Sequence, residues 1–226
     1  MTGLEALAAQ LPRVTAIIGG GGKTTLLHLL GQTLAEQGKR VVLTTTTHLA
    51  QERCAVSPVA VKELNDIQIK NHPILAAYPA ADGRMAGIPV EWYGAVEADY
   101  ILVEADGSRR LPLKVHRVFE PVIPPGAELL MQVAGLSALG KTVDESVHCY
   151  EEMGLRADRI VDEGVIGGLL LRGFEHCSAT TDCMAVLNQA DAAERLCAGE
   201  KIRRQLAEAG IRSAVTRLKG EVRCLY

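Results

Sequence analysis

The sequence is organised by the stretch Val14-Thr15-Ala16-Ile17-Ile18-Gly19-Gly20-Gly21-Gly22-Lys23-Thr24-Thr25. The apolar run 14–18 predicts a β-strand, and the leucines spaced along residues 26–34 predict a helix that begins directly after the glycines. A strand that feeds a glycine loop and then a helix points successive backbone N–H groups and the positive helix end at one spot. The sequence therefore predicts a cradle for the phosphates of a nucleotide.

Each residue type in this loop has a chemical reason to be there. Glycines let the backbone approach an oxyanion without a Cβ in the way and let it take positive φ. Lys23 brings a flexible charge to the outer phosphates as a catalytic group, and Thr24 offers its hydroxyl to Mg²⁺. We therefore expect the nucleotide to be bound by Gly19, Gly20, Gly21, Gly22, Lys23, Thr24 and Thr25.

The loop departs from the pattern G-x-x-x-x-G-K-[ST], because Ile17 occupies the position of its first glycine. What remains, G-x-x-G-K-T-T, resembles two P-loop groups. One is the Mur ligases, and the other is the metallochaperone and partition-type GTPases and ATPases. The alternative interpretation is a glycine-rich turn that merely precedes a helix.

Length and composition limit the possible architectures. The chain has 226 residues, enough to bury a substantial core. A βαβ unit around the glycine loop predicts an α/β protein of P-loop NTPase-like fold, with a mainly parallel sheet flanked by helices on both faces. We expect one domain over residues 1–226, with an irregular inserted region at about 49–97.

Charge and hydropathy narrow the partners. With 24 basic and 27 acidic residues the formal net charge is -3, so no strong field attracts nucleic acid or an anionic membrane. No apolar stretch approaches the length needed to cross a bilayer, and Glu5 interrupts the region where a signal peptide would need an apolar core. We expect a cytoplasmic protein whose six cysteines, which lack C-x-x-C spacing, are reduced.

A second motif follows the apolar run 100–103, which is typical of a buried strand and ends in Glu104-Ala105-Asp106-Gly107. An acid at the carboxyl end of a strand next to the glycine loop can reach Mg²⁺ or polarise the attacking water. We expect Glu104 and Asp106 to be catalytic, with Glu104 also a metal ligand. An ordinary Asp-Gly turn is the alternative.

The threonine run 44–47 ends another predicted strand. Thr46 or Thr47 is our candidate to complete the Mg²⁺ shell beside Thr24 and Glu104, or to contact the γ-phosphate. The alternative is a strand prolonged by β-branched residues.

The strand predicted at 184–187 ends in Asn188-Gln189-Ala190-Asp191. GTPases place N-K-x-D here: the asparagine holds loops together, and the aspartate accepts two N–H groups from the edge of guanine. Gln189 replaces the usual lysine, which weakens the choice of guanine over adenine, and Asn and Asp are also common helix caps. We expect Asn188 and Asp191 to bind the base of ATP or GTP.

A basic segment follows the Glu104 motif and could hold an anion, either the γ-phosphate or a second substrate. The alternative is a solvated run of charges, and Glu120 could pair with one of them. The candidate residues are Arg109, Arg110, Lys114 and His116.

These motifs together resemble the YqeC family of the P-loop NTPase superfamily, over about residues 14–191. Residues 104–124 carry the most specific part of the match. The family is described as a selenium-cofactor biosynthesis protein, an accessory to selenium-dependent molybdenum hydroxylases. The resemblance implies that Lys23, Thr24 and Glu104 serve nucleotide and Mg²⁺. It also implies that the basic segment serves a partner or substrate that the resemblance does not identify. The partners that it implies for the protein are a selenium-dependent molybdenum hydroxylase or a selenium donor.

Three functions remain open from the sequence. The first is an NTP-hydrolysing accessory protein that drives selenium insertion. The second is a Mur-ligase-like enzyme that uses ATP to activate a small acid. The third is a nucleotide-regulated binding module without turnover.

Overall fold

The computed structural model describes residues 3–49, 59–69, 72–79 and 85–218. Its helices are α1 (Gly3–Ala8), α2 (Lys23–Glu36), α3 (Val143–Ser146), α4 (Glu163–Phe174) and α5 (Ala193–Glu208). Its strands are β1 (Val14–Gly19), β2 (Val41–Thr45), β3 (His48–Leu49), β4 (Val59–Ala60), β5 (Ile74–Pro79), β6 (Met85–Gly87), β7 (Tyr100–Glu104), β8 (Leu113–Lys114), β9 (Leu129–Gly135), β10 (Val147–His148), β11 (Asp182–Asn188) and β12 (Arg212–Val215). Short 3-10 helices cover Leu64–Asp66, Val90–Trp92, Leu136–Ala138 and Tyr150–Met153.

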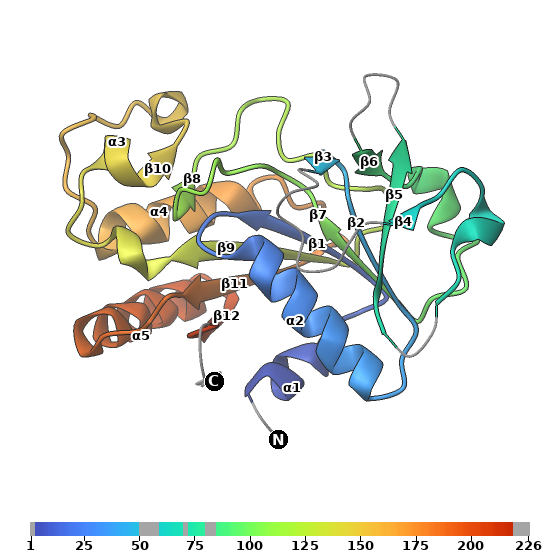
Figure 1. Ribbon diagram of the computed structural model, residues 1–226. Coiled ribbons are helices and arrows are strands. Elements are labelled where there is room, and N and C mark those ends of the chain that lie inside the picture. Colours follow the sequence, from blue (N-terminus) through green and yellow to red (C-terminus); the bar gives the residue numbers. More distant parts are fainter. Residues whose placement is uncertain (1–2, 50–58, 70–71, 80–84, 219–226) are drawn as a thin grey trace.

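The central sheet has the strand order β12-β11-β9-β1-β7-β2-β5-β6-β3, with β4 paired to β5 (Figure 1). All pairs from β12 to β5 are parallel, whereas β6 runs antiparallel to both β5 and β3. After β1 the chain moves to one side, to β2, and later returns to the other, to β9 and β11. Ligands of open α/β sheets bind at the carboxyl ends of the strands where the order reverses in this way. The glycine loop leaves β1 at that edge.

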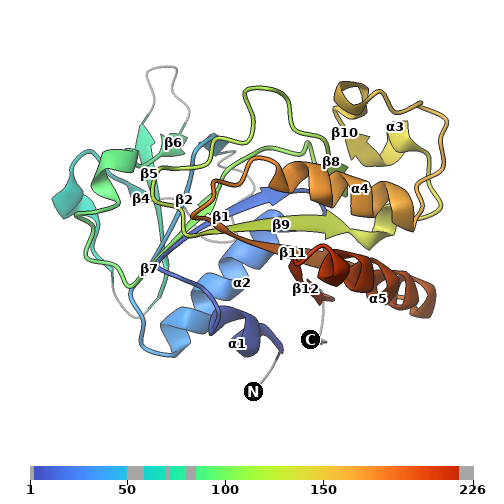
Figure 2. The same ribbon diagram turned by 180° about the vertical axis from the view of Figure 1, so that it is seen from behind.

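Helices cover both faces of the sheet, as the sequence predicted. On one face α1 and α2 bury Leu7, Leu26 and Leu30 against Ile17 and its neighbours. On the other face α4 and α5 bury Ile166 and Ile202 with the opposite side chains of the same strands (Figures 1 and 2). Every residue of β1 and β9 is buried and most are apolar, as expected for strands of a sheet with helices packed on both faces.

The region at 49–97 extends the sheet beyond β2. The sequence of residues 74–78 and of the stretch around Met85 predicts a hairpin at a sheet edge, and β5 and β6 do pair in antiparallel register; residues 80–84 between them lie outside the described residues. Arg13 ties this region to the base of β1: its guanidinium donates to the carbonyls of Tyr93, Val96 and Ala98 at 2.9–3.3 Å. None of the described helices is long and apolar enough to cross a membrane.

Two expectations from the sequence were wrong. The sequence of residues 143–153 has a helical pattern and predicts one helix, but α3 stops at Ser146 because Val147 and His148 pair with β8 instead. All six cysteines were expected to be reduced, but Cys177 and Cys183 form a disulfide. The α4–β11 connection brings these two together, whereas Cys54 and Cys224 lie outside the described residues.

Candidate nucleotide-binding site

The mouth of α2 presents a row of free backbone donors. No hydrogen bond joins the N–H groups of Gly22, Lys23, Thr24 or Thr25 to a described residue, and the first helical bond runs from Leu26 N–H to the Gly22 carbonyl at 2.9 Å. Thr24 and Thr25 are exposed. Free amides together with the helix dipole favour an anion at this point.

The first three glycines of the loop do not offer free N–H groups, because their N–H groups are bonded within the protein. Gly19 donates to Asp106 Oδ2 at 2.8 Å, Gly20 to the Val133 carbonyl at 2.9 Å and Gly21 to the Leu111 carbonyl at 3.3 Å. These bonds fix the loop to its neighbours and leave the later amides to face outward.

Glycine is required here by close packing and by backbone conformation. A Cβ on Gly20 would lie 2.6 Å from the Leu111 carbonyl oxygen, and one on Gly22 would lie 2.5 Å from Asn188 Nδ2. Gly22 also has φ 124, which L side chains rarely adopt.

Lys23 turns back under the loop and is 4% exposed. Its ammonium donates to the Gly19 carbonyl at 2.6 Å and lies 3.0 Å from Asp106 Oδ1. Glu104 Oε1 is more distant, at 3.9 Å. Lys23 therefore sits beside the free amides but is already paired with a carboxylate.

Asp106 is the centre of a buried charged network. Its Oδ2 accepts from His116 Nε2 at 2.6 Å and lies 3.8 Å from Lys114 Nζ, and Lys114 pairs in turn with Glu120 at 2.9 Å. Burial disfavours the ionised carboxylate, but Lys23, the His116 hydrogen bond and Lys114 outweigh it and lower the pKa of Asp106 to about 2. Asp106 is fully buried, so it positions Lys23 and Gly19 and has no contact with solvent.

Glu104 faces the mouth of α2. The parallel pairing of β1 with β7 sets Glu104 beside Ile17, and the Thr24 hydroxyl donates to Glu104 Oε2 at 2.8 Å. Burial raises the pKa of Glu104, and Lys23 and the Thr24 hydrogen bond offset part of that rise. A hydroxyl and a carboxylate side by side are oxygen ligands of the kind Mg²⁺ takes alongside phosphates and water.

Thr46 lies at the same edge but its hydroxyl has another partner. Its N–H donates to the Glu104 carbonyl at 3.1 Å, whereas its Oγ1 donates to the Val122 carbonyl at 2.6 Å. Thr45 Oγ1 also donates to the Glu104 carbonyl, at 2.6 Å. These bonds tie β2 to the end of β7. Within the described ranges, no three His, Cys, Asp or Glu side chains gather as a metal site.

Asn188 joins three segments behind the loop. Its Nδ2 donates to the Gly21 carbonyl at 2.7 Å, and its Oδ1 accepts from Thr216 Oγ1 and Leu218 N–H, both at 3.2 Å. Asn188 therefore holds the glycine loop against the segment that follows β12. Thr216 was missed from the sequence, since only the pairing of β12 with β11 brings it here.

Asp191 lies on the loop that follows β11, anchored by a bond from Ala190 N–H to the Thr216 carbonyl at 3.2 Å. Its carboxylate is exposed and makes no hydrogen bond or ion pair with the described residues. Gln189, at the usual lysine position, has φ 67 and accepts from Ser137 Oγ at 2.5 Å.

The basic segment divides into two pairs. Lys114 and His116 are buried on Asp106 and are not available to an outside ligand. Arg109 and Arg110 are exposed, have φ 48 and φ 68, and form no ion pair with the described residues. Left-handed backbone at two consecutive non-glycine residues is rare and concentrates at functional sites.

The fold and this site together define a class: an α/β protein with a mainly parallel sheet and a glycine loop that leads into a helix where the strand order reverses. Residues 15–151 match the model of the family described as YqeC protein. The chain belongs to that family. It is 35% identical over 158 residues to "Uncharacterized protein YqeC" of Escherichia coli (strain K12). The match covers 64% of this chain and 60% of that relative, so it spans less than two thirds of the relative's length.

Proposed function

We propose that this chain binds Mg²⁺ with ATP or GTP at the mouth of α2 and hydrolyses the nucleotide. On the resemblance described above, its task is to assist selenium cofactor biosynthesis or insertion into a selenium-dependent molybdenum hydroxylase, with that enzyme or a selenium donor as partner. One observation carries the nucleotide part. Four successive free amides at 22–25 meet the Thr24–Glu104 oxygen pair and the Lys23 ammonium at one edge of the sheet.

In this proposal the amides of 22–25 hold phosphate oxygens, and Thr24 with Glu104 holds Mg²⁺, which neutralises phosphate charge when bound. Lys23 exchanges its contact with Asp106 for the outer phosphates. That exchange connects phosphate binding to the segment from Asp106 to Glu120, because Asp106 also holds His116 and lies near Lys114. A ligand that contacts one state of such a segment more strongly shifts its population.

Calorimetric titration with ATP and with GTP, each with and without Mg²⁺, tests the proposal. We expect binding that requires Mg²⁺, and we expect Lys23→Ala to weaken it at least tenfold, since a hydrogen bond to a charged group contributes about 1.5–3 kcal/mol. Lys39→Ala is the matched control, because Lys39 is exposed just beyond the far end of α2.

Lys23 also neutralises Asp106, so the Lys23→Ala variant is checked by thermal unfolding. Thr24→Ala removes no buried charge and serves as a second test. Equal binding by wild type and both variants would refute the site. Binding without phosphate release, even with the hydroxylase partner present, would replace the enzyme with a nucleotide-regulated binding module.

A further inference from the structure

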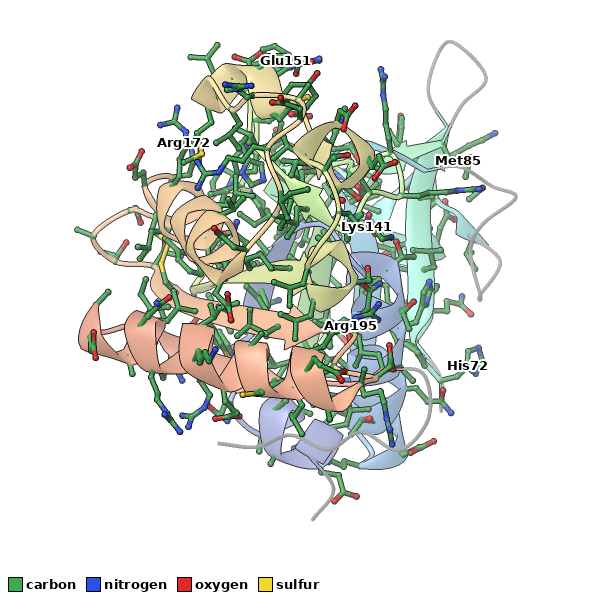
Figure 3. All side chains as sticks on the ribbon, turned by 90° about the vertical axis from the view of Figure 1, so that its left-hand side faces the viewer. His72, Met85, Lys141, Glu151, Arg172 and Arg195 are labelled. Atoms are coloured by element: carbon green, nitrogen blue, oxygen red, sulfur yellow. A yellow bond between two sulfur atoms is a disulfide. The ribbon has the colours of Figure 1, made fainter. Side chains whose placement is uncertain are left out.

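The disulfide lies on the connection between α4 and β11 (Figure 3). Cys177 follows the C-terminal end of α4, and Cys183 is the second residue of β11. Both cysteines are partly exposed, so a small thiol can reach them. Cys149 and Cys197, by contrast, are free thiols.

The residue before Cys177 contacts the buried network. The His176 ring packs edge-on against the His116 ring, with 5.6 Å between centroids and 77° between planes. His176 is exposed, whereas His116 is only 7% exposed. His176 therefore covers His116 from the solvent side, and its position depends on the segment that the disulfide closes.

From His116 the contacts continue directly into the phosphate loop. His116 Nε2 donates to Asp106 Oδ2, which also accepts the Gly19 N–H at 2.8 Å. The other oxygen of Asp106 holds Lys23. Only His176, His116 and Asp106 separate the disulfide from the first glycine and the lysine of the loop.

We propose that Cys177 and Cys183 form a reversible disulfide that controls the order of the phosphate loop through His176, His116 and Asp106. Closing it removes one proton and one electron from each thiol and joins the two sulfurs; oxidised glutathione accepts the two protons and two electrons, its own S–S bond breaks, and it leaves as two thiols. Opening it by a dithiol is the reverse exchange. Disulfides in reducing compartments are usually transient and redox-sensing, which suits an accessible pair.

Which redox state has the more ordered loop follows from how the disulfide restrains His176. The bond ties the residue after His176 to β11, which keeps the His176 ring on His116 and the His116 ring on Asp106. Asp106 then holds Gly19 and Lys23 in the arrangement described here. Reduction frees the end of α4, loosens this chain of contacts and increases the entropy that the loop loses when a ligand binds. The oxidised form is therefore the one with the more ordered loop.

Hydrogen exchange and peptide mapping test the inference on the full chain, after treatment with oxidised glutathione or with dithiothreitol. We expect mapping to find the 177–183 bond in the oxidised protein. We also expect the Gly19 amide to exchange about fivefold faster after reduction, the low end of typical couplings between sites. Cys177→Ser should exchange at the reduced rate under both conditions, whereas Cys197→Ser should respond like wild type.

His176→Ala separates the proposed path from a general effect of the disulfide. It leaves both sulfurs in place but removes the ring contact with His116. We expect the oxidised variant to show the fast Gly19 exchange of the reduced wild type. Slow exchange in this variant would overturn the path, and absence of the 177–183 bond after oxidation, or a Gly19 rate independent of redox state, would overturn the inference itself.

The effect on ligand binding rests on the proposed function. We expect the dissociation constant for the Mg²⁺-bound nucleotide to rise about fivefold on reduction. If no nucleotide binds but Gly19 exchange still follows the redox state, the proposed function fails and the coupling stands. If nucleotide binds equally in both states while Gly19 exchange stays constant, the coupling fails and the nucleotide site stands.

Discussion

The inner and outer sides of the glycine loop (residues 19–25) differ in what their polar and charged groups already contact. On the inner side Lys23, Asp106, His116 and Lys114 are buried and paired with one another. On the outer side Thr24, Thr25 and Asp191 are exposed. Neighbours in sequence thus fall on opposite sides, as Lys23 and Thr24 do. The inner side determines the shape of the loop, and the outer side offers the groups that can bind a ligand.

Glu104 and Asp106 show this difference most clearly. Along a continuous strand, residues two apart would face the same side of the sheet. Strand β7 ends at Glu104, however, and the chain then turns, so Asp106 points inward to Gly19 while Glu104 reaches Thr24. The two acids consequently have shifts of opposite sign: the pKa of Glu104 is raised by burial, and that of Asp106 is lowered by its cationic partners despite burial.

The largest expected effect is the loss of folding stability when Asp106→Asn removes the carboxylate at the centre of the buried network. This change leaves Lys23 and Lys114 buried without their shared counter-charge, and removing one partner of a buried pair costs about 3–5 kcal/mol. Chemical denaturation measures the loss. The wild type should also lose stability as pH falls from 3.8 toward about 2, because the stabilising ionised form of Asp106 is present above that range and protonates within it.

The Asp106→Asn variant should lack that acid-dependent loss. Asp191→Asn, an exposed acid-to-amide change, is the matched control and should leave the free energy of unfolding within about 0.5 kcal/mol. Equal stability of Asp106→Asn and wild type would show that the inner network does not hold the fold.

The second effect concerns the choice of base on the outer side. If the Asp191 carboxylate accepts two N–H groups of guanine, Asp191→Asn should weaken GTP binding roughly 10- to 100-fold and leave ATP binding unchanged, because one acceptor becomes a donor. Competition titrations measure the ratio of GTP affinity to ATP affinity in each protein. An unchanged preference would remove Asp191 from base recognition.

The smallest of the three effects sharpens the role of the Thr24–Glu104 pair. Glu104→Gln should weaken Mg²⁺ binding in the nucleotide complex about tenfold with little change in stability. Because burial raises the pKa of Glu104, Mg²⁺ affinity of the wild type should rise with pH as this carboxyl ionises, and the glutamine variant should lose that dependence. Titrations of Mg²⁺ into the nucleotide complexes of wild type and Glu104→Gln at several pH values measure this difference. Identical pH dependence in the two proteins would show that Glu104 is not a metal ligand.

Much of the site could be located from the sequence, because it depends on local order along the chain. A glycine loop between an apolar strand and a leucine-striped helix, and acids at the ends of buried strands, place their residues at the carboxyl edge of any parallel sheet. Which amides stay free could not be read this way. Gly19, Gly20 and Gly21 direct their N–H groups to Asp106, Val133 and Leu111, which lie on three other segments.

The helix expected at 143–153 failed for a related reason. Val147 and His148 fit a helix by pattern, but the nearby Leu113–Lys114 strand offers them a pairing partner that no local pattern reveals. The contact of His176 with His116 is likewise invisible in the sequence, where the two lie on separate segments.

By itself, the sequence determined the α/β class, the glycine loop between β1 and α2, and the strand ends that surround it, because strand, turn and helix preferences act between near neighbours. Only the tertiary structure decided that Asp106 is buried while Glu104 faces the loop mouth, that Lys114 and His116 support the loop from inside, and that Cys177 bonds to Cys183. Segments distant along the chain determine which polar and charged side chains are buried and paired. Only the remaining ones are available to a ligand.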